Sequence, residues 1–436
     1  MLYHNILKNL IMPVANYAMS TKDMHYLKLI SNMEAWPEEK IREWQNVKFL
    51  KIMSHFYNNT TYYPRIFSEI GLSIKDIYSI EDLKKIPQID KKIFNEERQS
   101  LLPKNLSTIK YKYSSTGGSS GDPLKFYLDL DSWSFTIANK IHNWEKSKYK
   151  YGDLHIALGS SSLFPESRSL KHKVFHWLKN EIPLNGMNMS ASVINQYINL
   201  INRKKIAFLY GYASSLFLLA DYVLKNEIEI HSVKVAFPTS EILTAHFEKT
   251  IKAAFNCEIV DSYGARDGGI TAFKTNSKNY HVGYNSYILD DENHNQPQPI
   301  IITDLFNYTF PFINYNLGDT IELDRSESNR DYNGQIISHI YGRESDILYL
   351  DNGNNITGPG FTILFRDFNV AAYQIQKVSG LHIKCTIQKT VKYSESEEKQ
   401  IRHAIQKYIG HDCKLEIVYS TAIPLGKNGK VKYFIK

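Results

Sequence analysis

The sequence predicts an α/β protein with a large N-terminal domain of mixed and parallel sheets with flanking helices, and a small α+β C-terminal domain joined by a hinge. Three observations predict this class. Between residues 131 and 263 short apolar segments alternate with amphipathic helical segments, the pattern of parallel strands covered by helices. From 280 to 345 the pattern changes to short strands and turns. After residue 345 two predicted strands flank one helix.

Composition limits the class of protein further. The chain has 436 residues, 43% of them hydrophobic, which is enough for two or three domains with full cores. The net charge of +7 is scattered, which argues against a nucleic-acid surface and favours anionic ligands such as nucleotides. Cys257, Cys385 and Cys413 are far apart and predict neither a disulfide framework nor a structural zinc site. No apolar run is long enough to span a bilayer, and residues 5–15 are too interrupted for a signal peptide, so we expect a soluble cytoplasmic protein.

Residues 1–85 are predicted to be helical. Within the stretch 47–57 four apolar side chains recur at i, i+3, i+4 and i+7, which places them on one face of a helix: Phe49, Ile52, Met53 and Phe56. The segment 79–82 (SIED) has the capping-box form that opens a further helix.

The stretch 113–123 (YSSTGGSSGDP) is a loop rich in glycine and hydroxyl groups between two alternating strands, 109–113 and 124–128. Its glycines permit tight turns, and its hydroxyls and backbone N–H groups suit a polyphosphate. A flexible linker has a similar composition, so the loop by itself leaves both interpretations open. It lacks the lysine of the Gly-Lys-Ser/Thr phosphate loop and the spacing of the dinucleotide fingerprint.

The alternating region is predicted to contain helices and strands in turn. The expected helices are 131–150, 192–205, 213–225 and 240–255, and the expected strands are 156–158, 206–211, 233–237 and 258–263. Ligands of parallel sheets bind at the carboxyl ends of strands. Three strand ends carry small or polar clusters, at 159–161 (GSS), 211–213 (GYA) and 264–267 (GARD). Further along, strands are expected at 300–305, 381–388 and 414–419, and a helix at 395–408.

Five motifs follow in order: YSSTGGSSGDP (113–123), SYGARDGG (262–269), TDLFNYTFPFINYNLGD (303–319), YGRESDIL (341–348) and PLGKNGK (424–430). With these motifs the chain resembles the adenylate-forming superfamily of acid-activating enzymes, from about residue 45 to the end. It looks most similar to the phenylacetate–coenzyme A ligase-like branch, which includes proteins of capsular polysaccharide biosynthesis. The resemblance implies that a carboxylate and ATP give an acyl-adenylate and pyrophosphate, and that a nucleophile then displaces AMP.

The resemblance also implies roles for motif residues. The loop would bind the β,γ-phosphates of ATP through hydroxyl and backbone N–H groups of Ser114, Ser115, Gly117, Gly118, Ser119 and Gly121. Thr116 and Asp267 would hold Mg²⁺, although most relatives carry Glu at the second position, so the shorter Asp needs the backbone or a water to reach the ion. Tyr263, followed by Gly264, would lie beside the adenine.

Two further residues are expected to contact the nucleotide. By the resemblance, the Asp319 carboxylate would accept hydrogen bonds from both ribose hydroxyls. Without the resemblance, Asp319 would be interpreted as a turn residue after Gly318. Arg343 would contact the ribose or a phosphate.

Lys430 is the residue expected to catalyse adenylation, because the resemblance brings its ammonium to the α-phosphate and the acyl carboxylate. Lys427 is the rival, and a solvated loop lysine is the ordinary alternative for either. A hinge near 343–347 would let a small domain (343–436) swing against the large one (1–342) between the two reactions. Ser345, followed by Asp346, stands where relatives carry the hinge Asp or Lys.

The predicted function is an AMP-forming ligase that uses ATP, Mg²⁺, a carboxylic acid and an acceptor. The acceptor is an amine in a polysaccharide pathway or, alternatively, coenzyme A. Gly211, Tyr212, Ser240 and Glu241 are candidates for the acid pocket. A nucleotide-binding protein without catalysis is a third hypothesis, because Asp267 and Ser345 depart from the motif pattern. We expect no nucleic-acid partner and no transmembrane segment; peripheral association with a polysaccharide assembly system is compatible with the resemblance.

Overall fold

The computed structural model divides the chain into two compact units. It describes residues 2–115, 124–159, 170–186, 189, 191–243, 245–275, 277–291, 297–325, 332–343, 347–349, 355–357, 364–365, 368–390, 393–409, 412–421, 423 and 434–435. Unit 1 comprises Met1–Thr116, Leu124–Leu317 and Ile321–His339. Unit 2 comprises Gly117–Pro123, Gly318–Thr320 and Ile340–Lys436. The domain boundary between residues 342 and 343 stays a prediction.

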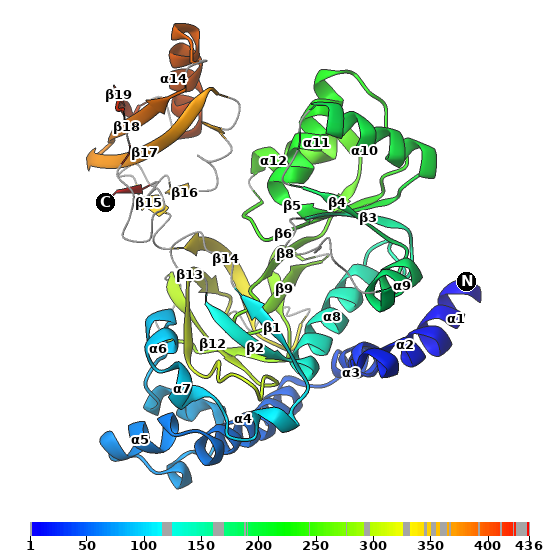
Figure 1. Cartoon of the computed structure of the whole chain (residues 1–436), viewed down its shortest axis with the longest axis vertical. Coiled ribbons are helices and arrows are strands. Elements are labelled where there is room, and N and C mark those ends of the chain that lie inside the picture. Colours follow the sequence, from blue (N-terminus) through cyan, green and yellow to red (C-terminus); the bar gives the residue numbers. More distant parts are fainter. Residues whose placement is uncertain are drawn as a thin grey trace. The chain divides into compact units, whose positions relative to one another are not determined.

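Unit 1 begins with the predicted helical region, shown in blue in Figure 1. The helices are α1 (Leu2–Ile6), α2 (Met12–Met19), α3 (Asp23–Met33), α4 (Glu38–Asn59), α5 (Tyr62–Glu69), α6 (Lys91–Glu96) and α7 (Arg98–Leu101). In α4 the four apolar side chains predicted to share a face are all buried, which confirms their spacing. Ser79 and Asp82 form the expected capping box, but the helix that they open, Ile80–Lys85, is a 3-10 helix.

A five-stranded parallel sheet occupies the middle of unit 1, in the order β4-β3-β5-β6-β7. Its strands are β3 (His155–Gly159), β4 (Glu181–Asn185), β5 (Phe208–Tyr212), β6 (Val235–Thr239) and β7 (Glu258–Ile259). The predicted alternation of strands and helices is therefore confirmed. Neither β4 nor α9 (Leu170–Leu178) was predicted.

Helices cover both faces of this sheet (Figure 1). On one face an apolar core fills the space beneath α10 (Ala191–Lys204), α11 (Ala213–Lys225) and α12 (Ala245–Phe255). On the other face lies α8 (Leu130–Glu145), whose Trp144 ring stacks on Phe237 of β6 with centroids 4.1 Å apart. This arrangement buries alternate residues of each strand on opposite sides, as a two-sided parallel sheet requires.

The expectation of one strand over 258–263 is wrong, because the chain changes sheets at the buried Val260. The residues before it form β7, and those after it form β8 (Asp261–Gly264), which pairs antiparallel with β9 (Thr271–Lys274). The second sheet has the order β11-β12-β13-β14-β10-β9-β8. Its other strands are β10 (Tyr280–Val282), β11 (Ser286–Ile288), β12 (Gln298–Asp304), β13 (Tyr315–Leu323) and β14 (Ile336–Arg343).

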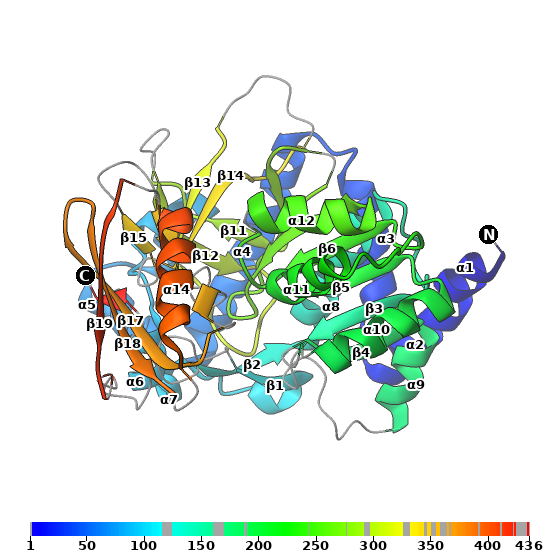
Figure 2. The ribbon, with the colours of Figure 1, turned by 90° about the horizontal axis from the view of Figure 1, so that it is seen from above.

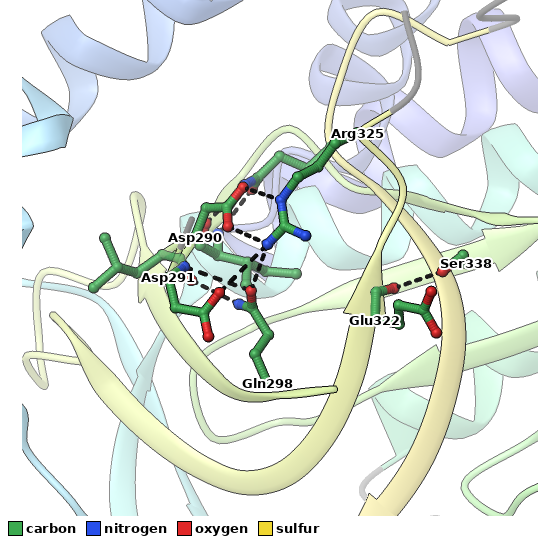
Figure 3. Close-up of polar contacts among 9 residues, drawn as sticks. Asp290, Asp291, Gln298, Glu322, Arg325 and Ser338 are labelled. Atoms are coloured by element: carbon green, nitrogen blue, oxygen red, sulfur yellow. Dashed lines mark hydrogen bonds and ion pairs between the residues drawn. The ribbon is translucent and has the colours of Figure 1, made fainter. Parts of the chain in front are cut away.

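An ion-pair network closes one end of this second sheet (Figure 3). Arg325 follows β13, and its Nε donates to Asp290 Oδ2 at 2.8 Å while a terminal nitrogen donates to Gln298 Oε1 at 3.0 Å. The same terminal nitrogen reaches Asp291 at 3.5 Å. The Arg325 guanidinium therefore links the segments that follow β11 and β13 to the start of β12.

Unit 2 contains a four-stranded mixed sheet in the order β19-β18-β17-β20, with α14 (Glu395–Ile409) beside it (Figure 2). The strands are β17 (Val370–Ser379), β18 (His382–Lys389), β19 (Lys414–Tyr419) and β20 (Phe434–Ile435). Ile401 and Ile405 of α14 pack against strand residues such as Ile375 and Ile383. A separate hairpin joins β15 (Ile347–Tyr349) to β16 (Asn355–Thr357). The predicted β18, α14 and β19 are confirmed, whereas β17 was not predicted.

The predicted α/β class is thus confirmed, with a helix-flanked parallel sheet and a small unit of mixed sheet. Among the helices that the structure describes, none is long and apolar enough to cross a membrane.

Candidate active site

The glycine-rich loop connects two paired strands, β1 (Tyr111–Ser115) and β2 (Lys125–Asp129). They are antiparallel, with Ser115 opposite Lys125 at the loop end and Tyr111 opposite Asp129 at the other. Ser114 is buried and Ser115 is exposed, and both belong to β1 rather than to the loop itself. The remaining phosphate-binding candidates, at 116–121, lie outside the described residues.

The SYGARDGG motif forms the turn between β8 and β9. Gly264 pairs with Thr271, and the turn is closed by hydrogen bonds from Ala265 N to Ile270 O (3.1 Å) and from Gly269 N to Arg266 O (3.3 Å). Asp267 lies in this turn and is buried, and the Tyr315 hydroxyl donates to its Oδ2 at 3.1 Å. A buried hydrogen bond of this kind restricts the carboxylate to few orientations.

The two glycines after Asp267 are required by the backbone. Gly268 and Gly269 have φ values of +90° and +64°, in the left-handed region. A Cβ on Gly268 would collide with Ile302, and a Cβ on Gly269 would collide with Asp304. Asn285 fixes the same turn, because its Nδ2 donates to Gly269 O at 2.9 Å.

Asp304, at the end of β12, is the buried group against which this turn packs. Its carboxylate accepts hydrogen bonds from the Ser132 hydroxyl of α8 (2.7 Å) and from the Phe306 N–H (2.9 Å). Burial raises the pKa of Asp304 to about 7, since desolvation disfavours the charged form. A carboxyl with a raised pKa therefore lies directly against the turn that carries Asp267.

Tyr263 is a partly buried residue of β8 and pairs with Ala272. The neighbouring Ser262 hydroxyl donates to Pro238 O at 2.9 Å, which ties β8 to the carboxyl end of β6. The motif turn therefore follows a strand held beside the parallel sheet. That Tyr263 and Gly264 bind adenine stays a prediction.

The carboxyl ends of β3 and β5 lie at one edge of the parallel sheet, because Leu158 pairs with Gly211. A Cβ on Gly211 would collide with Leu158, so glycine allows this close approach. Tyr212 ends β5, and Ser240, with φ of +65°, directly follows β6. The structure thus brings these acid-pocket candidates to one edge; their role stays a prediction.

Asp319 lies within β13 and follows Gly318, whose φ is +83°. Its side chain is partly exposed, and residues 318–320 group with unit 2. Arg343 is the last residue of β14. The side chain of Arg343, together with Ser345, Asp346, Lys427 and Lys430, falls outside the described residues.

The described side chains fit a magnesium site completed by a nucleotide. Where the chain is described, no group of three or more His, Cys, Asp or Glu side chains could hold a metal ion by itself. Mg²⁺ is usually bound by one or two carboxylates together with substrate phosphates and water. Asp267, buried and hydrogen-bonded to Tyr315, is a described carboxylate of this kind; that it holds Mg²⁺ stays a prediction.

Tyr315 and Asp304 were not predicted as site residues. Both lie in the recognised motif 303–319, but the sequence does not show that Tyr315 reaches Asp267 or that Asp304 packs against Gly269. The motif TDLFNYTFPFINYNLGD itself was the signal that pointed to this part of the chain. The contacts themselves join residues far apart in the chain.

This fold is that of adenylate-forming ligases. The crystal structure of a 2-hydroxyisobutyryl-CoA ligase, in the postadenylation state in complex with R3-HIB-AMP, matches with a TM-score of 0.66 at 15% sequence identity. The match covers 93% of this chain and 91% of that chain.

Two curated proteins are similar in sequence over nearly the whole chain. Protein CapK of Staphylococcus aureus is 24% identical over 423 residues, covering 94% of this chain and 92% of the relative. Phenylacetate-coenzyme A ligase of Aromatoleum evansii is 22% identical over 441 residues, covering 92% of this chain and 95% of the relative. No family model matches the chain. The chain is thus similar in sequence to these two proteins over most of its length and has the fold of adenylate-forming ligases, which agrees with the resemblance shown by the motifs.

Proposed function

We propose that the protein is an ATP-dependent, AMP-forming ligase that activates a carboxylic acid as an acyl-adenylate. The observation that carries the proposal is Asp267, a buried carboxylate that accepts a hydrogen bond from Tyr315 at 3.1 Å. It stands at the acidic position of the SYGARDGG motif, and the other four motifs follow the order of the superfamily.

In the first step a carboxylate oxygen of the acid attacks the α-phosphorus of ATP, the bond to the β-phosphate oxygen breaks, and pyrophosphate leaves. The glycine-rich loop after β1 would spread the charge of the β,γ-phosphates over hydroxyl and backbone N–H donors. Lys430 would place its ammonium at the α-phosphate and the acyl carboxylate, where negative charge accumulates. Mg²⁺, held by Asp267 and Thr116, would neutralise phosphate charge.

In the second step an acceptor nucleophile attacks the acyl carbon and AMP leaves with the bonding electron pair. An amine acceptor gives an amide, and it is supported by the resemblance to the branch that includes polysaccharide-biosynthesis proteins. Coenzyme A gives a thioester, and it is supported by relatives that are named as coenzyme A ligases. Movement of residues 343–436 about a hinge near 343–347 would let one site serve both steps.

The test is to measure which bond of ATP is cleaved in the presence of a panel of carboxylic acids, including uronic acids. Acid-dependent formation of AMP and pyrophosphate is the expected result. Formation of ADP and phosphate would contradict the proposal, because it indicates an acyl-phosphate or kinase mechanism. ATP binding without cleavage, with every acid and acceptor tried, would support a nucleotide-binding protein without catalysis.

A further inference from the structure

Four basic side chains from separate elements of unit 1 are linked by electrostatic interactions between pairs of them. We call them the basic cluster: Lys112 of β1, Lys140 of α8, Lys179 in the turn between α9 and β4, and Arg266 of the motif turn. All four side chains are partly exposed.

Aromatic rings hold two of these lysines in place. The Lys140 Nζ lies 5.0 Å from the centroid of the Trp144 ring and 4.9 Å from that of Tyr210 in β5. The Lys112 Nζ lies over the Trp133 ring at 2.7 Å. Trp133, Lys140 and Trp144 are separated by seven and four positions on α8, so they share one face of that helix. The rings face the ammonium groups in cation–π contacts.

The pKa shifts of the lysines indicate that Arg266 and Lys179 act on Lys112, and that Lys140 acts on Lys179. Burial is the main cause that lowers the pKa of Lys112 to about 6, and the charge of Arg266 lowers it further. Burial also lowers the pKa of Lys140 and of Lys179, and each of these two interacts with the charge of Glu181. Because desolvation disfavours an ammonium, these lysines lose their protons more readily than exposed lysines do, and a bound anion would favour their charged form.

The charges of Asp23 and Glu181 favour the charged form of these lysines, but they offset the effect of burial only in part. Asp23 of α3 is buried, and burial raises the pKa of its carboxyl, which disfavours its charged form. Glu181 of β4 already faces two imidazoles, with His176 Nδ1 at 2.6 Å and His155 Nε2 at 3.6 Å.

Within the described residues Lys112, Lys140 and Arg266 form no ion pair with a carboxylate within 4.0 Å. An anion bound between them would supply the missing negative charge, and it would do so in surroundings that strengthen electrostatic attraction.

Two members of the cluster, Arg266 and Lys140, lie next to residues of the proposed site. Arg266 precedes Asp267 in the chain, so one end of the cluster is at the proposed reaction centre. Tyr210, which contacts Lys140, precedes the acid-pocket candidates Gly211 and Tyr212 on β5.

We propose that the acid substrate carries a second anionic group, a carboxylate, phosphate or sulfonate apart from the carboxylate that is activated, and that the basic cluster binds this second group. The inference rests on the proposed function and narrows its substrate to acids with at least two negative charges. Attraction between this group and several ammonium and guanidinium donors favours such acids over singly charged ones of similar size.

The first experiment compares matched acids by their rate of pyrophosphate release: butyrate with succinate, glycerate with 3-phosphoglycerate, and glucuronate with glucuronate 1-phosphate. We expect kcat/KM at least tenfold higher for the doubly charged member of the best pair. The pairs also distinguish a second carboxylate from a phosphate. Equal rates within every pair would overturn the proposal.

Substitutions in the basic cluster test whether these side chains cause the preference for doubly charged acids. Lys140→Met and Arg266→Gln remove one charge each, and we expect a tenfold or greater rise in KM for the doubly charged acid with an unchanged Kd for ATP. Lys148→Met, at an exposed lysine just beyond α8, is the matched control and should leave both constants unchanged. Loss of ATP affinity in Lys140→Met would overturn the proposal, because the cluster would then serve the nucleotide phosphates.

A binding experiment separates this inference from the proposed function. Lysines with a lowered pKa take up protons when an anion binds, so the calorimetric heat of binding succinate or 3-phosphoglycerate near pH 8 should depend on the ionisation enthalpy of the buffer. Lys112→Met should reduce this proton uptake. If succinate or 3-phosphoglycerate binds with proton uptake but ATP is not cleaved, the proposed reaction is contradicted and the anion-binding site is supported. If neither doubly charged acid binds better than its singly charged counterpart, the anion-binding site is excluded.

Discussion

Replacing Tyr315 by Phe tests whether the active site depends on the orientation of Asp267. The hydroxyl of Tyr315 donates to Asp267 at 3.1 Å, and its ring is 1% exposed and packs against Phe94 and Phe312 with centroids 5.0 and 5.2 Å away. Phenylalanine retains these ring contacts, so the substitution removes mainly the hydrogen bond.

The expected magnitude follows from that contact. A hydrogen bond to a charged group contributes about 1.5–3 kcal/mol, and 3.1 Å is towards the long end of the usual range, so we take about 1.5 kcal/mol. If that energy orients the carboxylate for Mg²⁺ and phosphate, kcat/KM for acid-dependent pyrophosphate release should fall by about tenfold. The Mg²⁺ concentration for half-maximal rate should rise in parallel.

The control is Tyr63→Phe. Tyr63 is also fully buried, and its hydroxyl has no hydrogen-bond partner among the described residues, so this variant removes an equivalent atom far from the motif turn. We expect its kinetics to equal those of the wild type. If Tyr315→Phe also matches the wild type in both kcat/KM and Mg²⁺ dependence, the Tyr315 contact has no role in positioning Asp267.

Three further predictions concern the same site. Lys430→Ala should abolish adenylation and leave the Kd for ATP within about twofold, while Lys427→Ala should retain adenylation; the reverse outcome would transfer the catalytic role to Lys427. Asp267→Glu restores the side chain common in the superfamily and should preserve or improve Mg²⁺-dependent turnover, so complete inactivation would show that position 267 does not hold the metal. The pKa of Asp304 is about 7 in the folded state, above its ordinary value of 3.8. Between these pH values the folded protein binds a proton that the unfolded chain releases. The free energy of unfolding should therefore decrease as the pH rises from about 4 to 7, because the proton is lost from the folded state. Three pKa units correspond to roughly 4 kcal/mol at most; urea unfolding across this pH range should show that decline in the wild type and a weaker one in Asp304→Asn, and equal slopes would contradict the assigned pKa.

Local pattern was sufficient for much of the fold. The alternation of apolar strands with amphipathic helices predicted the parallel sheet, and the bounds of α11 and β19 agree with the expected segments 213–225 and 414–419. Periodicity works here because each strand or helix must bury one side whatever its neighbours are. It failed at 258–263, since only Val260 separates β7 from β8 and only their hydrogen-bonding partners show that they belong to different sheets.

The motifs likewise identified the superfamily and pointed to Asp267, because their residue types and order can be recognised without coordinates. The contacts of that residue could not be predicted: Tyr315 is 48 positions away, and Ser132, which donates to Asp304, is separated from it by 172. The same holds for the basic cluster, whose members are ordinary lysines and an arginine until β1, α8 and the β8–β9 turn bring them together. A sequence records the charge of each side chain, but burial and neighbouring charges, which set its pKa and its ligand, exist only after distant segments have packed.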